Sequence, residues 1–180
     1  FLLPGHGSSG GVRCTSIVAS SLLDRGHDVR ILYQKPNATL RSWLRSVRDR
    51  IVYSRAPDWL GQFEGRIFVF HNIATCHFDP DEIIVTVGMA MSAQLAFLNS
   101  LPNQKVQYIH GATPWDPVLM KRALSLPMPK IVVANYLTEI VARHHGGEVL
   151  AVVHNGVDRD EYFSSVAESQ RDGVGVIYSS

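Results

Sequence analysis

The first twelve residues, FLLPGHGSSGGV (residues 1–12), predict the end of a strand, a glycine-rich loop and the start of a helix. The apolar segment Phe1–Leu3 has the character of a strand end, and the glycine-rich loop Pro4–Gly11 follows it. A helical pattern then covers Val12–Arg25, and Gly26 is its expected stop; the apolar face of this helix consists of Val12, Ala19, Leu22 and Leu23. The chain therefore opens with a predicted strand, loop and helix.

Strands and helices continue to alternate along the chain, and several strands are apolar without a break. Continuous apolar runs indicate strands that are buried on both faces, as in a parallel sheet flanked by helices. The order predicts a doubly wound α/β fold with a mostly parallel, Rossmann-like sheet. Residues 37–65 are expected to hold a helix and a loop. The further strands are predicted at Val29–Tyr33, Ile67–Phe70, Glu82–Val87, Lys105–Ile109, Lys130–Ala134 and Val149–Val153, and the further helices at Ala90–Asn99, Trp115–Ser125 and Tyr136–His145.

Composition narrows the classes of function. The 180 residues are 46% apolar and carry a net charge of +1, which gives no support for nucleic acid as a partner. Cys14 and Cys76 form neither a metal-binding spacing nor a disulfide framework, and they suggest a reducing compartment. No apolar run is long enough to span a membrane, so a cytoplasmic location is expected.

The C-terminal part predicts a domain boundary. The apolar Val152 and Val153 run into His154-Asn155-Gly156-Val157-Asp158, where Asn-Gly favours a sharp turn, and Phe163 follows five residues later. A polar segment and a new apolar strand come next. We therefore expect one domain over residues 1–163, a linker over 164–172 and the first strand of a second domain over 173–180.

The glycine-rich loop is a candidate anion site. Glycines let a backbone approach a ligand closely, and the N-terminus of the following helix favours negative charge. The loop matches G-x-G-x-x-G, but Tyr33-Gln34-Lys35 stand where a dinucleotide site has its acidic ribose ligand. The alternative is a strand–helix turn capped by Ser8 or Ser9.

His110 is the candidate catalytic residue, because it ends a buried strand and precedes Gly111. Ligands of open α/β sheets bind beyond the C-terminal ends of strands, and a histidine there can donate to a substrate hydroxyl or a leaving oxygen near neutral pH. The alternative is a structural histidine bonded to a loop carbonyl. Trp115 nearby suits stacking on a sugar or lipid, or a place in the core.

Other polar residues give weaker signals. His71, Asn72, His77 and Asp79 follow a strand but lack a metal-ligand spacing, so no metal is expected. The pair at 144–145 lies at a helix end, where a cation suits the dipole, and is interpreted as structural. Walker loops, nucleophile elbows and catalytic triads are absent from the sequence.

Three motifs together resemble the N-terminal domain of a GT-B glycosyltransferase, most closely family four of the retaining enzymes. The first is Gly10-Gly11-Val12, a helix, and then Arg25-Gly26-His27-Asp28-Val29. The second is the strand Ile131-Val132-Val133-Ala134-Asn135, and the third is Val153-His154-Asn155-Gly156-Val157-Asp158 with Phe163. The resemblance covers nearly the whole chain.

The resemblance implies half of a two-domain enzyme. The first domain of such enzymes mostly binds the acceptor, a glycan or a lipid-linked sugar, and the second binds the nucleotide-sugar donor. It implies retention of configuration without a metal or other cofactor, and it implies that the 180 residues alone are inactive. One departure is Arg13, where relatives often have Glu. The implied site places His110 at the transferred sugar, Gly10 and Gly11 at the donor phosphates, and Ser9, Trp115 and Asn135 on the acceptor side of the cleft.

Alternatives to this function remain open at the level of the sequence. One is a binding module that holds a nucleotide or carbohydrate without turnover, and another is a sugar-nucleotide epimerase of the GT-B fold. The arginine-rich segment 41–55 raises peripheral contact with anionic lipid or acidic glycan as a further hypothesis, against the alternative of a solvated helix face.

Overall fold

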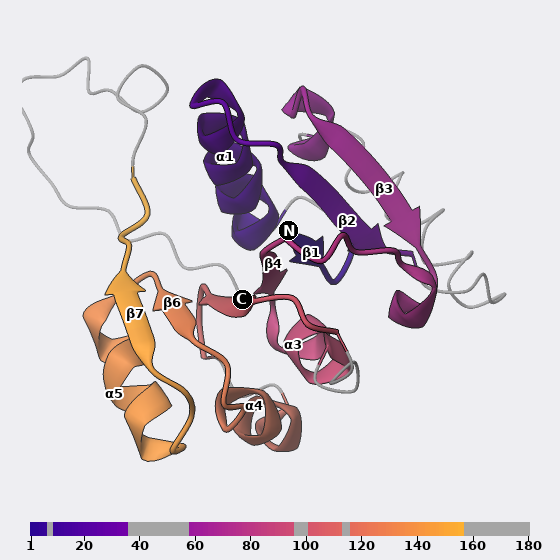
Figure 1. Ribbon diagram of the computed structural model, residues 1–180. Helices are drawn as coiled ribbons and strands as arrows, with labels where there is room; N and C mark the ends of the chain where they lie inside the picture. The colour runs from indigo at the N-terminus through magenta and orange to yellow at the C-terminus, as the bar shows by residue number, and fades with distance from the viewer. Residues whose placement is uncertain (7–8, 36–57, 96–100, 113–115, 157–180) are drawn as a thin grey trace, which may run out of the picture.

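The computed structural model describes residues 1–6, 9–35, 58–95, 101–112 and 116–156 (Figure 1). Several predictions lie outside these ranges. They concern most of the segment at 37–65, the arginine-rich stretch 41–55, Trp115, and the linker and second-domain strand at 164–180.

The core of the protein is one sheet of seven parallel strands in the order β3-β2-β1-β4-β5-β6-β7. Every pairing between neighbouring strands is parallel, which confirms the predicted doubly wound α/β fold. The order reverses between β1 and β4, the first strands of the two halves. The strands are β1 Leu2–Leu3, β2 Arg30–Gln34, β3 Arg66–Phe70, β4 Ile84–Val87, β5 Lys105–Ile109, β6 Lys130–Val132 and β7 Val149–Val152.

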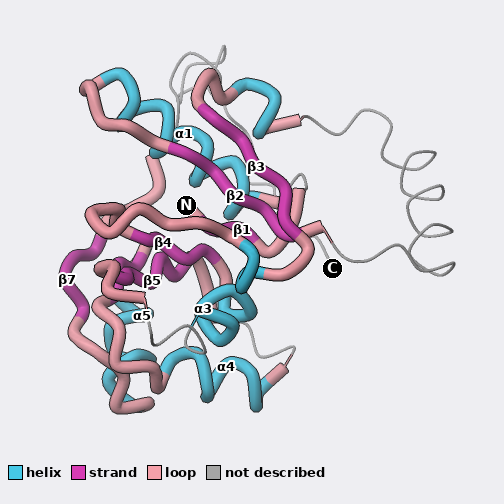
Figure 2. Tube along the Cα trace, turned by 45° about the vertical axis from the view of Figure 1, so that its right-hand side comes forward, coloured by secondary structure: helices cyan, strands magenta, loops and turns pink. Residues whose placement is uncertain are grey.

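Helices cover both faces of the sheet. Successive strand residues point to opposite faces, so Leu3 packs with Val12 and Ala19 of α1 (Gly10–Asp24), whereas Leu2 belongs to a separate cluster with Met91 of α3 (Met89–Leu95). α4 (Pro117–Leu124) lies beside α3, and α5 (Asn135–Arg143) packs on β6 and β7 (Figures 1 and 2). Two short 3₁₀ turns, Leu60–Gln62 and Ile73–Thr75, flank β3.

Local sequence explains where α1 begins and ends. Ser9 is its N-cap, and its side chain accepts a hydrogen bond from the Val12 amide at 3.4 Å. Gly26 follows the last turn with φ of +87°, a conformation that only glycine adopts freely. The predicted stop at Gly26 and the capping by Ser9 are both confirmed.

β3 departs from the burial that its apolar sequence predicts. It is an edge strand, and Ile67, Phe68 and Val69 are 36%, 44% and 50% exposed. A strand at the edge has a neighbour on one side only, so its sequence was a poor guide to double-sided burial.

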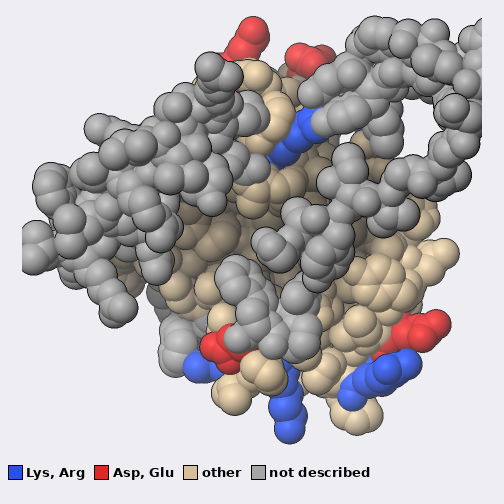
Figure 3. All heavy atoms as spheres, turned by 180° about the vertical axis from the view of Figure 1, so that it is seen from behind, with Lys and Arg blue, Asp and Glu red and all other residues tan. Residues whose placement is uncertain are grey.

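Charged side chains are scattered over one face of the protein (Figure 3). On the face shown in Figure 3, neither sign gathers into one continuous patch among the coloured residues. None of the helices in the described ranges combines the length and the apolarity that crossing a membrane requires.

Candidate functional site

A pocket of about 540 Å³ opens at the carboxyl edge of the sheet, where β1, β4 and β5 end and α1, α3 and α4 begin. This position is the point at which the strand order reverses, and ligands of open α/β sheets bind at such a point. Its volume is that of a small-molecule site. The lining consists of Leu3, Pro4, Ser9, Gly11, Val12, Val87, Gly88, Met89, Ala90, Gln107, Tyr108, Ile109, His110, Gly111, Asp116 and Leu119.

His110 stands in the wall of this pocket, directly after β5. Its ring contacts the Tyr108 ring at a centroid distance of 4.2 Å, and Nε2 is buried without a hydrogen-bond partner among the described residues. Burial lowers the pKa of His110 below its usual 6.5, so the imidazole is neutral at pH 7. A neutral ring with an unpartnered Nε2 is able to make a hydrogen bond to a ligand.

The glycine-rich loop meets His110 across the pocket. A Cβ built on Gly11 would lie 4.0 Å from Cγ of His110, at ordinary van der Waals distance, so Gly11 borders the imidazole directly. Gly10 is exposed, has no heavy atom within 4 Å of an added Cβ, and does not line the pocket. The structure thus brings Ser9, Gly11 and His110 together in the lining of one pocket.

Asn135, the other described residue predicted for the cleft, lies elsewhere. Asn135 is the exposed first residue of α5, after β6, and it does not line the pocket. Trp115 lies outside the described residues. His6, in the same loop as Ser9, faces away toward Asp58, with Nε2 at 2.9 Å from Oδ1, and stacks near the ring of Tyr33.

Gln107 is the pocket residue that the sequence reasoning missed. Its side chain is 1% exposed, and neither its nitrogen nor its oxygen has a hydrogen-bond partner within the described part of the chain. The signal was present in the sequence, because Gln107 is the one uncharged polar residue in the otherwise apolar run that follows Lys105. A buried amide without a partner is unusual in a native protein.

The pocket is apolar and almost free of charge. Among the described residues, Asp116 is the only charged one in the lining, and its carboxylate accepts a hydrogen bond from the Leu119 amide at 2.9 Å as the N-cap of α4. The described part of the lining holds no lysine or arginine. Within the described ranges, no three His, Cys, Asp or Glu side chains converge in a way that could hold a metal ion.

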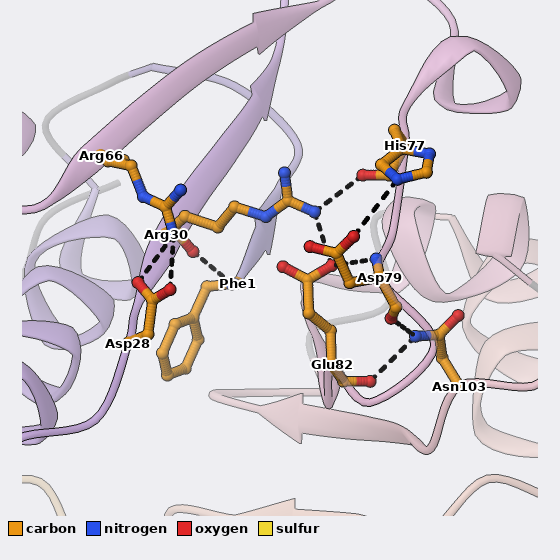
Figure 4. Close-up of polar contacts among 8 residues, drawn as sticks. All are labelled: Phe1, Asp28, Arg30, Arg66, His77, Asp79, Glu82 and Asn103. Atoms are coloured by element: carbon orange, nitrogen blue, oxygen red, sulfur yellow. Dashed lines mark hydrogen bonds and ion pairs between the residues drawn. The ribbon is translucent and has the colours of Figure 1, made fainter.

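A second hollow, of about 560 Å³, lies at the opposite, amino edge of the sheet. Four of its charged side chains, those of Arg30, Glu82, Arg66 and Asp28, form two pairs (Figure 4). Arg30 donates to Glu82 at 2.5 Å and to the His77 carbonyl at 2.7 Å, and Arg66 contacts both carboxylate oxygens of Asp28 at 2.7 Å.

The remaining contacts at this amino edge also satisfy backbone groups. Glu82 accepts from the Asp79 amide at 2.9 Å, and the Asn103 amide donates to the carbonyls of Asp79 and Glu82 at 2.6 and 3.0 Å (Figure 4). His77 lies 3.3 Å from the Asp79 carboxylate. This cluster ties the segment between β3 and β4 to the sheet.

Comparison with protein-family models, with curated proteins and with solved structures returned no match. The fold and the geometry of the pocket are therefore the basis for any statement about function.

Proposed function

We propose that the chain forms the acceptor-side domain of a retaining GT-B glycosyltransferase, which moves a sugar from a nucleotide-sugar to a glycan or lipid-linked acceptor. The observation that carries the proposal is the meeting of Gly11 and His110 in the pocket at the reversal of strand order. The motifs that resemble the family supply the second support.

The proposed role of His110 follows from its charge and surroundings. Because burial lowers the pKa of His110, the ring remains neutral at pH 7 and offers a hydrogen bond without introducing a positive charge. Nε2 has no competing partner among the described residues. A hydroxyl of the transferred sugar is the ligand group that this arrangement suits.

The proposed role of the glycine-rich loop follows from the helix behind it. The N-terminus of α1, which has 15 residues, carries partial positive charge and unpaired amides that favour a diphosphate. Gly11 leaves room for a ligand next to His110. Donor phosphates and acceptor sugar would then meet above the ends of β1 and β5, while a second domain holds the nucleotide.

The direct test is a transfer assay with the protein expressed from its complete gene. It would be incubated with a panel of nucleotide-sugars and glycan or lipid-linked acceptors, and the anomeric configuration of the product would be read by NMR. Transfer with retention supports the proposal. Epimerisation of free donor would assign the epimerase, and ligand binding without any turnover would assign the binding module.

A further inference from the structure

We propose that Gln107 is a specificity-determining residue of this pocket, whose amide hydrogen-bonds a neutral group of the acceptor sugar that both donates and accepts, a hydroxyl or an acylamido substituent. The identity of the ligand as an acceptor sugar rests on the proposed function above. The need for a polar partner does not, because it follows from burial alone.

The first observation is that the amide is buried and unsatisfied. Gln107 is 1% exposed and lines the pocket, and both its Nε2 and its Oε1 are without a hydrogen-bond partner among the described residues. Leaving a buried amide without partners costs free energy, and a ligand that supplies them recovers it. Both the donor and the acceptor of this amide are therefore left for a ligand to satisfy.

The second observation is that the neighbouring polar side chains are already engaged. Thr86 stands opposite Gln107 in the register of β4 and β5, and its hydroxyl lies 2.9 Å from that of Ser92. Both residues are fully buried, and one hydroxyl donates to the other. The hydroxyl that accepts has its own proton left for a backbone carbonyl, that of Val106 at 3.4 Å from Thr86 or that of Gly88 at 3.2 Å from Ser92. They leave the amide of Gln107 for another partner.

The third observation concerns the charge of that partner. The lining formed by the described residues holds no lysine or arginine, and its one carboxylate, Asp116, is engaged as a helix cap. An ionised group beside Gln107 would be buried without a counter-charge, which is costly. The apolar walls, which include Met89, Ile109 and Leu119, suit the carbon face of a sugar or the methyl of an acetamido group instead.

The test uses two probes and a shape-preserving change. Methyl β-glucoside and methyl N-acetyl-β-glucosaminide would be titrated into the ¹⁵N-labelled 180-residue chain, and dissociation constants read from NMR shifts. Gln107→Met removes the amide but keeps the length of the side chain. We expect it to weaken the better probe by about tenfold or more, since one hydrogen bond to a buried polar group is lost. The thermal midpoint of the free chain should stay the same or rise.

Two further variants complete the design. Gln104→Met makes the same chemical change at an exposed position just before β5, and it should leave both dissociation constants unchanged. Gln107→Asn keeps a buried amide but shortens its reach, and it should also weaken the probe, which covers the case in which Gln107→Met fails to fold.

The outcomes separate this inference from the proposed function. If wild type binds a probe in the pocket and both Gln107 variants bind it equally well, the role of Gln107 is overturned while the sugar site stands. If wild type binds neither probe, the sugar site itself fails and the role of Gln107 with it. A fall in thermal midpoint with unchanged affinity would make Gln107 purely structural.

Discussion

The two edges of the sheet carry hollows of nearly equal volume, about 540 Å³ at the carboxyl edge and about 560 Å³ at the amino edge, but they treat polar groups in opposite ways. At the amino edge Arg30, Glu82 and Asp79 are joined in a connected set of bonds. At the carboxyl edge His110 Nε2 and the amide of Gln107 are buried and without partners in the described structure.

The difference separates a structural cluster at the amino edge from the binding site that we propose at the carboxyl edge. Charged groups that pair with one another hold segments together, and their hydrogen-bonding capacity is then used within the protein. The one buried side-chain atom of the amino-edge cluster without a described partner is Asn103 Oδ1. Buried polar groups without hydrogen-bond partners lower the stability of the free protein, and a ligand that bonds to them gains affinity. The volumes of the two hollows are too similar to show this difference.

The largest expected effect is loss of sugar transfer when the carboxyl edge is changed at His110. In the protein from the complete gene, His110→Ala should slow transfer by about 100-fold or more, because the hydrogen bond to the transferred sugar is lost. His27→Ala changes a histidine that lines the amino-edge hollow, and it should transfer at the wild-type rate. Equal rates for wild type and His110→Ala would remove His110 from the mechanism.

The amino edge should respond in stability instead. Glu82→Ala removes a carboxylate that accepts from Arg30 and from the Asp79 amide, in a pair whose side chains are only 18% and 27% exposed. We expect the free energy of unfolding to fall by about 1.5–3 kcal/mol, as for hydrogen bonds to charged groups. Urea unfolding measures this change.

A matched control lies in the same hollow. Asp28→Ala breaks the pair with Arg66, whose side chains are 59% and 80% exposed, and should cost less than about 1 kcal/mol. Neither variant should alter binding of sugar probes at the other edge. A loss of probe binding in Glu82→Ala with the fold intact would contradict the separation of the two edges.

Two glycines of the carboxyl-edge pocket should differ from each other in stability. Gly88 has φ of +87°, and an added Cβ would lie 3.3 Å from Cγ of Pro4, so Gly88→Ala should cost about 1–2 kcal/mol. Gly111 also lines the pocket, but its backbone φ is not positive, and an added Cβ would have no heavy atom within 4 Å. Gly111→Ala should unfold at nearly the wild-type urea midpoint, and equal losses in both variants would show that backbone strain at Gly88 is not the cause.

The smallest expected effect is a pH dependence that originates at the carboxyl edge. The pKa of His110 is lowered in the folded protein, so the unfolded chain binds more protons once the pH falls below about 6.5. The free energy of unfolding should therefore decrease as the pH falls from 7.5 to 5.5, and His110→Gln should show a shallower decrease. A slope that is identical in wild type and His110→Gln would mean that His110 is protonated equally well in both states.

Much of the fold was predictable from the sequence because strand and helix periodicities differ. Apolar runs such as Lys105–Ile109 matched the observed strand, and Gly26 and Ser9 bounded α1 as local chemistry requires. The exposure of β3 was not predictable, because its place at the sheet edge depends on the order of the strands, which periodicity does not contain.

The site was predictable only in part. His110 and Gly11 stand at the ends of elements, where position in an α/β fold already indicates a ligand. Gln107 lies inside a strand, and whether its amide is satisfied depends on Thr86 and Ser92 bonding to each other instead. Such a bond is set by packing across the sheet, and no local pattern reveals it.

The most direct test is a crystal structure of the protein from the complete gene with a non-transferable nucleotide-sugar analogue and an acceptor sugar bound. We expect both sugars in the carboxyl-edge pocket, with a hydroxyl of the donor sugar within hydrogen-bond distance of His110 Nε2 and a neutral group of the acceptor sugar at the Gln107 amide. A sugar bound at the amino edge, beside Arg30 and Glu82, or one that leaves His110 and Gln107 without partners, would contradict this expectation.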